Sequence, residues 1–221
     1  MSDNGNNGLL LYGYWRSSSA YRVRIALNLK GLSYRQQPVH LVRDGGEQHR
    51  AEYRAVNPLG LVPALRHGAN TIVQSTAICE YLEETFPGTP LLPPDALGRA
   101  RVRSIVQTVA SEIQPLNNSG VTAYLKVDLG LGDAEVAHWY EHWVARGFAA
   151  VETWLQAADS GAFCHGDAPT LADCYLVPQV YNAERFDCNL EPYPRIREIA
   201  ARARALDAFR AASPEQQPDA V

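Results

Sequence analysis

The pattern of apolar residues changes at Pro87, and this change restricts the fold more than any other feature of the chain. Before Pro87, short apolar runs alternate with helical spacings in the order β-α-β-α-β-β-α, over about 80 residues. After it, strand signals vanish and apolar residues recur only at helical spacing. The sequence therefore predicts a thioredoxin-like α/β domain over residues 9–86 and an all-helical domain over residues 95–213.

The expected elements follow from local patterns. Strands are expected at Leu9–Tyr14, Ser33–Leu41, Leu61–Leu65 and Thr71–Val73. Helices are expected at Ala20–Lys30 and Glu47–Ala55, and a third helix is expected to be capped by Ser75. The four prolines of Pro87–Pro94 indicate a linker. Beyond the linker, long helices are expected over residues 97–125, 133–158, 171–186 and 193–212, and the polar tail from Pro214 is expected to fray.

Charge and composition exclude several classes of function. The net charge of -4 and the pI of about 5.9 favour neither a nucleic-acid partner nor an anionic membrane. No apolar run approaches the roughly 18 residues of a membrane-spanning helix. The polar N-terminus, Met1–Gly8, lacks the basic and apolar pattern of a signal peptide. We therefore expect a disordered tail and a cytoplasmic protein.

The four cysteines do not form a metal-binding pattern. None of them belongs to a C-x-x-C pair or precedes histidines at zinc-ligand spacing. We expect no metal site, and we expect the cysteines to be reduced thiols buried in the core: Cys79, Cys164, Cys174 and Cys188.

A hydroxyl-rich turn, Arg16–Ser19, lies where the first strand ends and the first helix begins. The N-terminus of a helix offers unpaired N–H groups and a positive field, which stabilise an anion such as a thiolate. A serine hydroxyl there can also donate a hydrogen bond to sulfur. The alternative is that a serine simply caps the helix.

Two further signals are weak when each is taken alone. Pro63 lies between apolar residues at the start of a short strand, where a proline is badly placed for a central ladder, although a plain turn explains it too. Gln74 and Ser75 begin a helix and are able to hold a carboxylate, or merely to cap the helix.

Taken together, these three signals resemble the glutathione site of the glutathione transferases in their order and spacing. In detail the chain is similar to the zeta class, which includes the maleylacetoacetate isomerases. The zeta signature Ser-Ser-Cys-x-Trp-Arg-Val-Arg-Ile-Ala-Leu corresponds here to Ser17-Ser-Ser-Ala-Tyr-Arg-Val-Arg-Ile-Ala-Leu27. Further matches are Val62-Pro63, Gln74-Ser75, Leu176–Val180 and Asn182–Phe186, and the resemblance extends over residues 9–218.

The resemblance implies a role for each matching residue. Ser17 would orient and activate the glutathione sulfur, with Ser18 and Ser19 beside it. Val62, turned by a cis peptide bond to Pro63, would pair with the cysteinyl backbone. The ends of the tripeptide would be held by Gln48, Gln74 and Ser75. From the second domain, Gln114, Asn118 and Ser119 would reach the cleft between the domains. The carboxylates of the substrate would be bound by Arg16 of the first domain and Arg185 of the second.

The resemblance also implies an activity, the glutathione-dependent cis–trans isomerisation of maleylacetoacetate to fumarylacetoacetate, within tyrosine and phenylalanine catabolism. The thiolate would add to the double bond of the diketo acid, the resulting single bond would rotate, and glutathione would be expelled unconsumed. The family further implies a homodimer and a glutathione transferase side activity.

The chain departs from the zeta pattern at two positions. Ser19 replaces the family cysteine, so that covalent or thiol-based help from that residue is excluded, and Tyr21 replaces a tryptophan. Three alternatives stay open: a maleylpyruvate isomerase, a transferase that dehalogenates α-halo acids, and a non-catalytic interaction module. The joint retention of Ser17, Pro63, Gln74 and Ser75 argues against the module. The absence of arginine from Asn117–Gly120 favours maleylacetoacetate over the more compact maleylpyruvate.

Other charged residues have simpler explanations. Thr170 and Asp173 fit a capping box at the start of a helix. Arg16, Arg22 and Arg24 form a basic cluster, from which one or more could attract a dianionic substrate. For two of the three, we expect solvation or a salt bridge.

Overall fold

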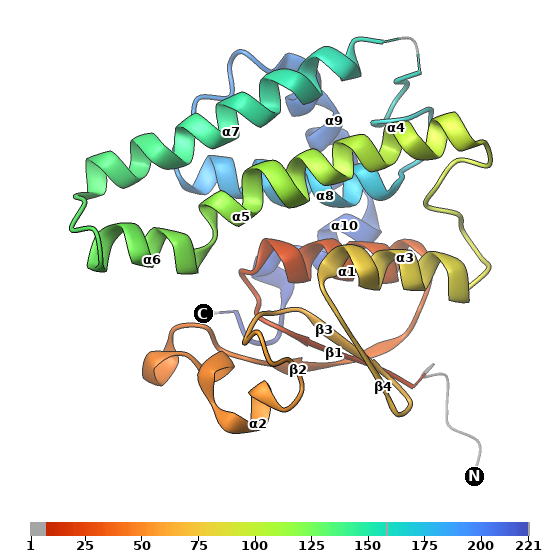
Figure 1. Ribbon diagram of the computed structural model, residues 1–221. Coiled ribbons are helices and arrows are strands. Elements are labelled where there is room, and N and C mark those ends of the chain that lie inside the picture. The colour runs from red at the N-terminus through yellow and green to blue at the C-terminus, as the bar shows by residue number, and fades with distance from the viewer. Residues whose placement is uncertain (1–7, 158, 221) are drawn as a thin grey trace. The chain divides into compact units, whose positions relative to one another are not determined.

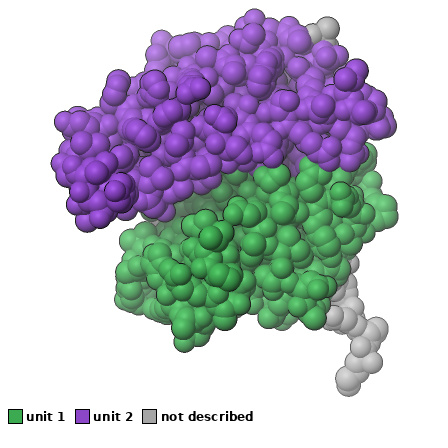
Figure 2. Space-filling view, viewed as in Figure 1, with its two compact units in different colours: residues 1–91, 206–221 green, residues 92–205 purple. Residues whose placement is uncertain are grey.

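The computed structural model describes residues 8–157 and 159–220. The chain divides into two compact units, coloured green and purple in Figure 2. The first unit comprises Met1–Leu91 together with Leu206–Val221, and the second comprises Leu92–Ala205. Most of the predicted N-terminal tail, residues 1–7, lies outside the described residues.

A four-stranded sheet forms the centre of the first unit. Its strands are β1 (Leu9–Gly13), β2 (Tyr34–Pro38), β3 (Ala64–His67) and β4 (Asn70–Val73), in the order β2-β1-β3-β4 (Figure 1). β1 runs parallel to β2, with Leu9 opposite Tyr34, and antiparallel to β3, which pairs with β4 in a hairpin. Leu9 and Leu11 of the central strand are fully buried. The thioredoxin-like prediction is confirmed.

The helices of the first unit are α1 (Ser18–Leu29), α2 (Ala51–Arg54), α3 (Ser75–Thr85) and α10 (Asp207–Ala212), with 3-10 turns at η1 (Arg43–Gly45), η2 (Glu47–His49) and η4 (Pro214–Gln216). The single helix predicted over Glu47–Ala55 is wrong. Arg50 has extended backbone angles, so η2 and α2 are separate short turns. Strand β3 begins at Ala64 rather than Leu61, since Pro63 has no N–H for the ladder.

Buried polar contacts join α1 to the elements around it. Lys30 forms a buried salt bridge with Glu83 of α3 at 2.8 Å. The Glu83 carboxylate also accepts the backbone N–H of Leu91, near the end of the proline-rich segment. A buried ion pair is favourable only when its remaining hydrogen-bonding capacity is used, as it is here. The linker is therefore attached to the first unit at Leu91.

The second unit is helical throughout its described elements. They are α4 (Ala96–Gln107), the π-helical segment η3 (Thr108–Ile113), α5 (Gln114–Asn117), α6 (Ser119–Val127), α7 (Asp133–Leu155), α8 (Leu171–Arg185) and α9 (Pro194–Arg204). The continuous helix predicted over residues 97–125 is interrupted twice. Pro115 cannot donate an intrahelical bond, and the π-helical segment precedes it. Asn118 then adopts an extended conformation and separates α5 from α6.

The predicted capping box at the start of α8 is confirmed, because Asp173 accepts both the N–H and the hydroxyl of Thr170. All four cysteines are buried thiols outside any disulfide, as predicted. The final helix is not continuous, since Leu206 is extended and α10 packs on α1. The prediction of a frayed tail after Pro214 is wrong, because Pro214 and Gln217 are buried.

Candidate functional site

Ser17 lies in the turn between β1 and α1 and is the N-cap residue of α1. Its hydroxyl oxygen accepts the N–H of Ala20 at 3.2 Å, and its own N–H donates to the carbonyl of Tyr14 at 3.0 Å. Because the oxygen accepts the capping bond, the hydroxyl hydrogen can point away from the helix, toward an anion at its positive end. The hydroxyl of Ser17 is thus suited both to capping and to binding an anion.

Ser18 and Ser19 form the first turn of α1. Ser18 is buried and Ser19 is half-buried. Within the described parts of the chain, neither of their backbone N–H groups has a hydrogen-bond partner. Free N–H groups at a helix start are the donors that stabilise a thiolate. The three serines therefore present one aligned hydroxyl and two backbone donors in the same turn.

Val62 supplies an unused stretch of backbone next to the sheet. The Val62–Pro63 peptide bond is cis, as the resemblance implied. Val62 is half-buried, and among the described residues its N–H and carbonyl make no hydrogen bond. Its neighbour is held firmly, because the Leu61 carbonyl accepts the Tyr53 hydroxyl and the Asn57 amide, each at 2.7 Å. An extended peptide could therefore pair with Val62 as an added strand.

Burial raises the pKa of the Tyr53 hydroxyl, which keeps it protonated as a donor to Leu61. Sequence reasoning did not assign Tyr53 or Asn57 to the site. The Asn57-Pro58 pair marks the end of a helix and also matches the zeta class, but neither pattern predicts the bond from Asn57 to Leu61.

Gln74 and Ser75 begin α3, although not as predicted. Gln74 is the N-cap residue, and no side chain caps this helix. Ser75 is instead the buried first residue of the helix, and its hydroxyl oxygen accepts a bond from the Arg22 guanidinium at 3.2 Å. The prediction that Ser75 caps the helix is therefore wrong. With its oxygen accepting from Arg22, the Ser75 hydroxyl is oriented to donate its hydrogen to a ligand.

Gln74 has a backbone conformation that side-chain-bearing residues rarely adopt, with φ 72° and ψ 120°. Its side chain is exposed and makes no hydrogen bond with any described residue. Strain of this kind persists where the surroundings enforce it, and it concentrates at binding sites. The conformation is consistent with the predicted binding role of Gln74, on grounds independent of its sequence motif.

This strain can be separated from side-chain recognition by two substitutions. Gln74→Gly and Gln74→Ala both remove the amide, so both should bind glutathione more weakly. The glycine variant alone tolerates the positive φ, so its free energy of unfolding should exceed that of the alanine variant by about 1 kcal/mol. Urea titration measures this difference. Equal stabilities of the two variants would contradict the assignment of strain.

Gln48 lies in η2, and its amide packs over Gly46 so closely that a Cβ at Gly46 would overlap it. The amide nitrogen donates to the Leu41 carbonyl at 3.2 Å. The amide oxygen is buried and has no partner among the described residues. A buried acceptor without a partner carries a desolvation penalty that a donor from a ligand would remove. This observation is consistent with the predicted role of Gln48.

In the second unit, the predicted residues cluster around the break between α5 and α6. Gln114 is the half-buried first residue of α5, and Ser119 is the exposed first residue of α6. Asn118 caps α6, because its side chain accepts the N–H of Val121 at 2.9 Å and donates to the Pro115 carbonyl at 2.8 Å. The Asn118 amide is therefore engaged in local structure, whereas Gln114 makes no side-chain bond to a described residue.

The two predicted substrate-binding arginines fall in different units. The Arg16 guanidinium lies over the Trp15 ring, 5.2 Å from its centroid, in the first unit. Arg185 ends α8 in the second unit and lies 4.5 Å from the centroid of the Phe186 ring, which stacks on Tyr140. Both guanidinium groups are thus oriented by an adjacent aromatic ring.

For the other two arginines of the basic cluster, the expectation of solvation is wrong. Arg22 and Arg24 are each only 1% exposed, so they are not solvated. Arg22 donates to Ser75, and Arg24 donates to the backbone carbonyls of Ala212 and Trp15, each at 2.9 Å. The guanidinium has five donors, which suits it to join several acceptors inside a fold. Arg22 and Arg24 therefore help to hold the residues around Ser75 and Trp15 in place. The sequence did not predict this role, because Ser75 and Ala212 lie far from these arginines along the chain.

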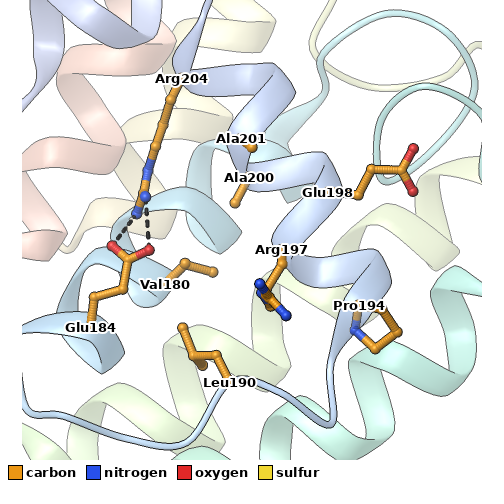
Figure 3. Close-up of a pocket in the computed structure, with 9 residues that line it drawn as sticks. All are labelled: Val180, Glu184, Leu190, Pro194, Arg197, Glu198, Ala200, Ala201 and Arg204. Atoms are coloured by element: carbon orange, nitrogen blue, oxygen red, sulfur yellow. Dashed lines mark hydrogen bonds and ion pairs between the residues drawn. The ribbon is translucent and has the colours of Figure 1, made fainter.

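A surface pocket of about 450 Å³ lies between α8 and α9 (Figure 3). None of the predicted site residues lines it. The pocket is therefore separate from the predicted site residues. Among its lining residues, Glu184 and Arg204 form a two-point salt bridge, at 2.8 and 2.9 Å.

Two further properties bear on the kind of site present. No helix in the described residues is both long and apolar enough to cross a membrane. The same residues contain no group of three or more His, Cys, Asp or Glu side chains arranged to hold a metal ion.

Known proteins resemble the whole chain. The family models for the "Glutathione S-transferase, N-terminal domain" and the "Glutathione S-transferase, C-terminal domain" match residues 11–90 and 137–212. The "Probable maleylacetoacetate isomerase" of Vibrio cholerae is 50% identical over 212 residues, which are 96% of this chain and 98% of the relative.

Two solved structures are also closely similar. The holo structure of a maleyl pyruvate isomerase, described as a bacterial zeta-class glutathione S-transferase, is 46% identical with a TM-score of 0.93, covering 96% of this chain and 100% of that one. A maleylacetoacetate isomerase from Anaeromyxobacter dehalogenans, solved with glutathione in its active site, is 49% identical with a TM-score of 0.85, covering 96% and 98%. Fold, motifs and identity agree over nearly the full length. The chain therefore belongs to the glutathione S-transferase family and, within it, to the zeta class.

Proposed function

We propose that this protein catalyses the glutathione-dependent cis–trans isomerisation of maleylacetoacetate to fumarylacetoacetate. The observation that carries the proposal is a set of unused donors within one unit. They are the first-turn N–H groups of α1 beside Ser17, the free backbone of Val62, and the exposed amide of Gln74. A fold that served only as an interaction module would not need all of them.

Glutathione fits the residues present. Its γ-glutamyl group would meet Gln74 and the Ser75 hydroxyl at the start of α3, where a helix N-terminus favours a carboxylate. Its cysteinyl backbone would pair with Val62, and its glycine end would meet Gln48. The buried, unpartnered oxygen of Gln48 supports this placement. Glutathione-bound relatives support the same cofactor.

When bound, glutathione supplies the nucleophilic sulfur whose addition and expulsion permit rotation about the double bond. The chain's own contribution is to favour the ionised sulfur. Ser17 donates its hydroxyl hydrogen, and the N–H groups of Ser18 and Ser19 add the field of the α1 terminus. Arg16 and Arg185 would hold the carboxylates of the diketo acid. Ser19 does not act as a nucleophile, since an alcohol is a poor one at neutral pH.

The choice of substrate follows from the number of cations available. Maleylpyruvate carries its second carboxylate near the reacting bond, so a site built for it needs more than one well-placed arginine there. Residues 117–120 contain none. Leaving a buried carboxylate unpaired costs several kcal/mol, on the order of 3 or more. In maleylacetoacetate the second carboxylate is farther away and is able to remain in solvent.

The substrate preference can be measured by the loss of ultraviolet absorbance of each diketo acid on one enzyme preparation with saturating glutathione. We expect kcat/KM for maleylacetoacetate to exceed that for maleylpyruvate. A roughly tenfold preference for maleylpyruvate, equivalent to about 1.4 kcal/mol, would reverse the assignment. The glutathione chemistry would be unaffected by that reversal. The relatives include named isomerases of both kinds.

Four broader properties complete the proposal. We propose a cytoplasmic homodimer that acts in tyrosine and phenylalanine catabolism and has glutathione transferase side activity. The same site could displace halide from an α-halo acid, since that reaction needs the same activated sulfur. That alternative differs from isomerisation in consuming glutathione.

A further inference from the structure

The backbone of Trp15, two residues before Ser17, is held on both sides by side chains from other elements. Its N–H donates to the Asp219 carboxylate at 3.0 Å. Its carbonyl accepts the Arg24 guanidinium at 2.9 Å. The N–H belongs to the peptide group that precedes Trp15 and the carbonyl to the one that follows it, so two consecutive peptide groups are restrained by hydrogen bonds. The turn that carries Ser17 is therefore fixed by contacts outside the turn itself.

The segment that carries Asp219 is itself anchored to the first unit. Gln217 is buried and accepts the Gln36 amide of β2 at 3.1 Å. Its own amide nitrogen donates to the carbonyls of Ala211 and Ser213. Asn28 of α1 donates to the Ala208 carbonyl at 2.9 Å. In Figure 1 this blue C-terminal segment lies against the elements of the first unit, with α10 beside α1.

Arg24 connects the C-terminal segment to the same turn. Its Nε donates to the Ala212 carbonyl at 2.9 Å, while its terminal nitrogens donate to Trp15 and, at 3.5 Å, to Tyr14. The Tyr14 carbonyl is also the acceptor for the Ser17 N–H. Burial lowers the pKa of Arg24 to about 10, which still leaves it charged at neutral pH.

We propose that Asp219 is a positioning residue for the reaction, and that it acts with Arg24 through the backbone on either side of Trp15 to aim the Ser17 hydroxyl at the sulfur. The inference rests on the proposed function, because it assumes that Ser17 faces the glutathione thiol. Asp219 itself touches neither glutathione nor the substrate. Its removal frees the Trp15 N–H and so misaligns a hydrogen bond made chiefly to the ionised sulfur.

The test compares Asp219→Ala, Asp219→Asn and a control, Asp207→Ala. The control removes a carboxylate of the same segment that pairs only locally with Arg210. Two quantities are measured: steady-state isomerisation, and the apparent pKa of the bound glutathione thiol from its ultraviolet thiolate absorbance. A third, the Tm, checks folding.

We expect Asp219→Ala to lower kcat about fivefold or more, with KM for the diketo acid nearly unchanged. The thiol pKa should rise by about half a unit. Asp219→Asn keeps an acceptor oxygen, so its kcat and its thiol pKa should both be close to those of the wild type. Asp207→Ala should resemble the wild type. The proposal is overturned if Asp219→Ala folds normally with wild-type kcat and thiol pKa, or if Asp219→Asn is as impaired as Asp219→Ala.

The thiol titration keeps this inference separate from the proposed function. If the wild type isomerises neither diketo acid, the proposed function fails. A rise in the thiol pKa of Asp219→Ala would still support the positioning role in that case. An unchanged thiol pKa beside an active wild type would remove the positioning role alone.

Discussion

Without glutathione, the purified protein is expected not to accelerate the isomerisation of maleylacetoacetate above its uncatalysed rate. No thiol of the chain can replace the cofactor, because all four cysteines are buried and Ser19 stands where the family has cysteine. Burial also raises the pKa of Cys164 and Cys188, which disfavours their thiolates further. The loss of activity should therefore be essentially complete. Ultraviolet absorbance of the diketo acid, with and without glutathione, measures it.

The matched control for this experiment is S-methylglutathione, which keeps the peptide but blocks the sulfur. It should compete with glutathione and support no turnover. Free thiol measured before and after many turnovers should be constant, because glutathione is regenerated. Full activity after exhaustive dialysis, with no bound thiol detected, would refute the mechanism. Steady consumption of thiol would instead favour a transferase.

Replacing Ser17 by alanine should lower kcat by about tenfold or more. The variant loses a hydrogen bond to a charged group, which contributes roughly 1.5–3 kcal/mol and therefore corresponds to a factor of this size in rate. The apparent affinity for glutathione should change less, because Gln74, Ser75 and Val62 are untouched. Steady-state kinetics with varied glutathione separate the two effects. The apparent pKa of the bound thiol should rise in parallel with the loss of kcat.

Ser17→Ala also removes the cap of α1, and such a loss costs about 1 kcal/mol of stability. Ser17→Thr is the control for this effect, since threonine keeps both the cap and a hydroxyl and should retain most of kcat. Ser18→Ala and Ser19→Ala remove neighbouring hydroxyls that do not cap the helix. If Ser18→Ala loses the activity while Ser17→Ala keeps it, the hydroxyl that activates the sulfur has been assigned to the wrong serine.

Sequence patterns that act locally predicted the fold well. The apolar runs around Leu11, Leu65 and Ile72 became β1, β3 and β4, because alternation and turn residues specify a strand without reference to distant parts. The capping box of Thr170 and Asp173 was confirmed for the same reason. The interruption at Pro115 was visible as a proline, but its conversion of the preceding turn to a π-helix depends on packing. Ile113 there lies against Gly147 of α7 with no room for a Cβ.

The candidate site was predictable where its residues belong to short motifs. Ser17, Pro63 and Gln74 each stand at a junction of two elements, and such junctions can be located from the sequence. The partners that orient them could not be found in this way. Ser75 appeared to be a cap, whereas it accepts a bond from Arg22, 53 residues away. The strain at Gln74 likewise has no sequence signal, since it is a backbone angle that the surrounding fold imposes.

The sequence by itself determined the class of fold and the family, and it suggested the positions that we propose for glutathione, because these depend on periodicity and on motifs of neighbouring residues. Only the tertiary structure decided the roles of Arg22, Arg24 and the segment after Leu206. From the sequence alone, a basic cluster and a polar tail are both expected to be exposed to solvent. Their burial depends on which carbonyls the folded chain brings within hydrogen-bond distance. Asp219 contacts Trp15 across 204 positions, and no local pattern carries a contact of that range. Interactions between remote residues therefore hold the turn that carries Ser17, while local sequence supplies the hydroxyl and N–H groups of that turn.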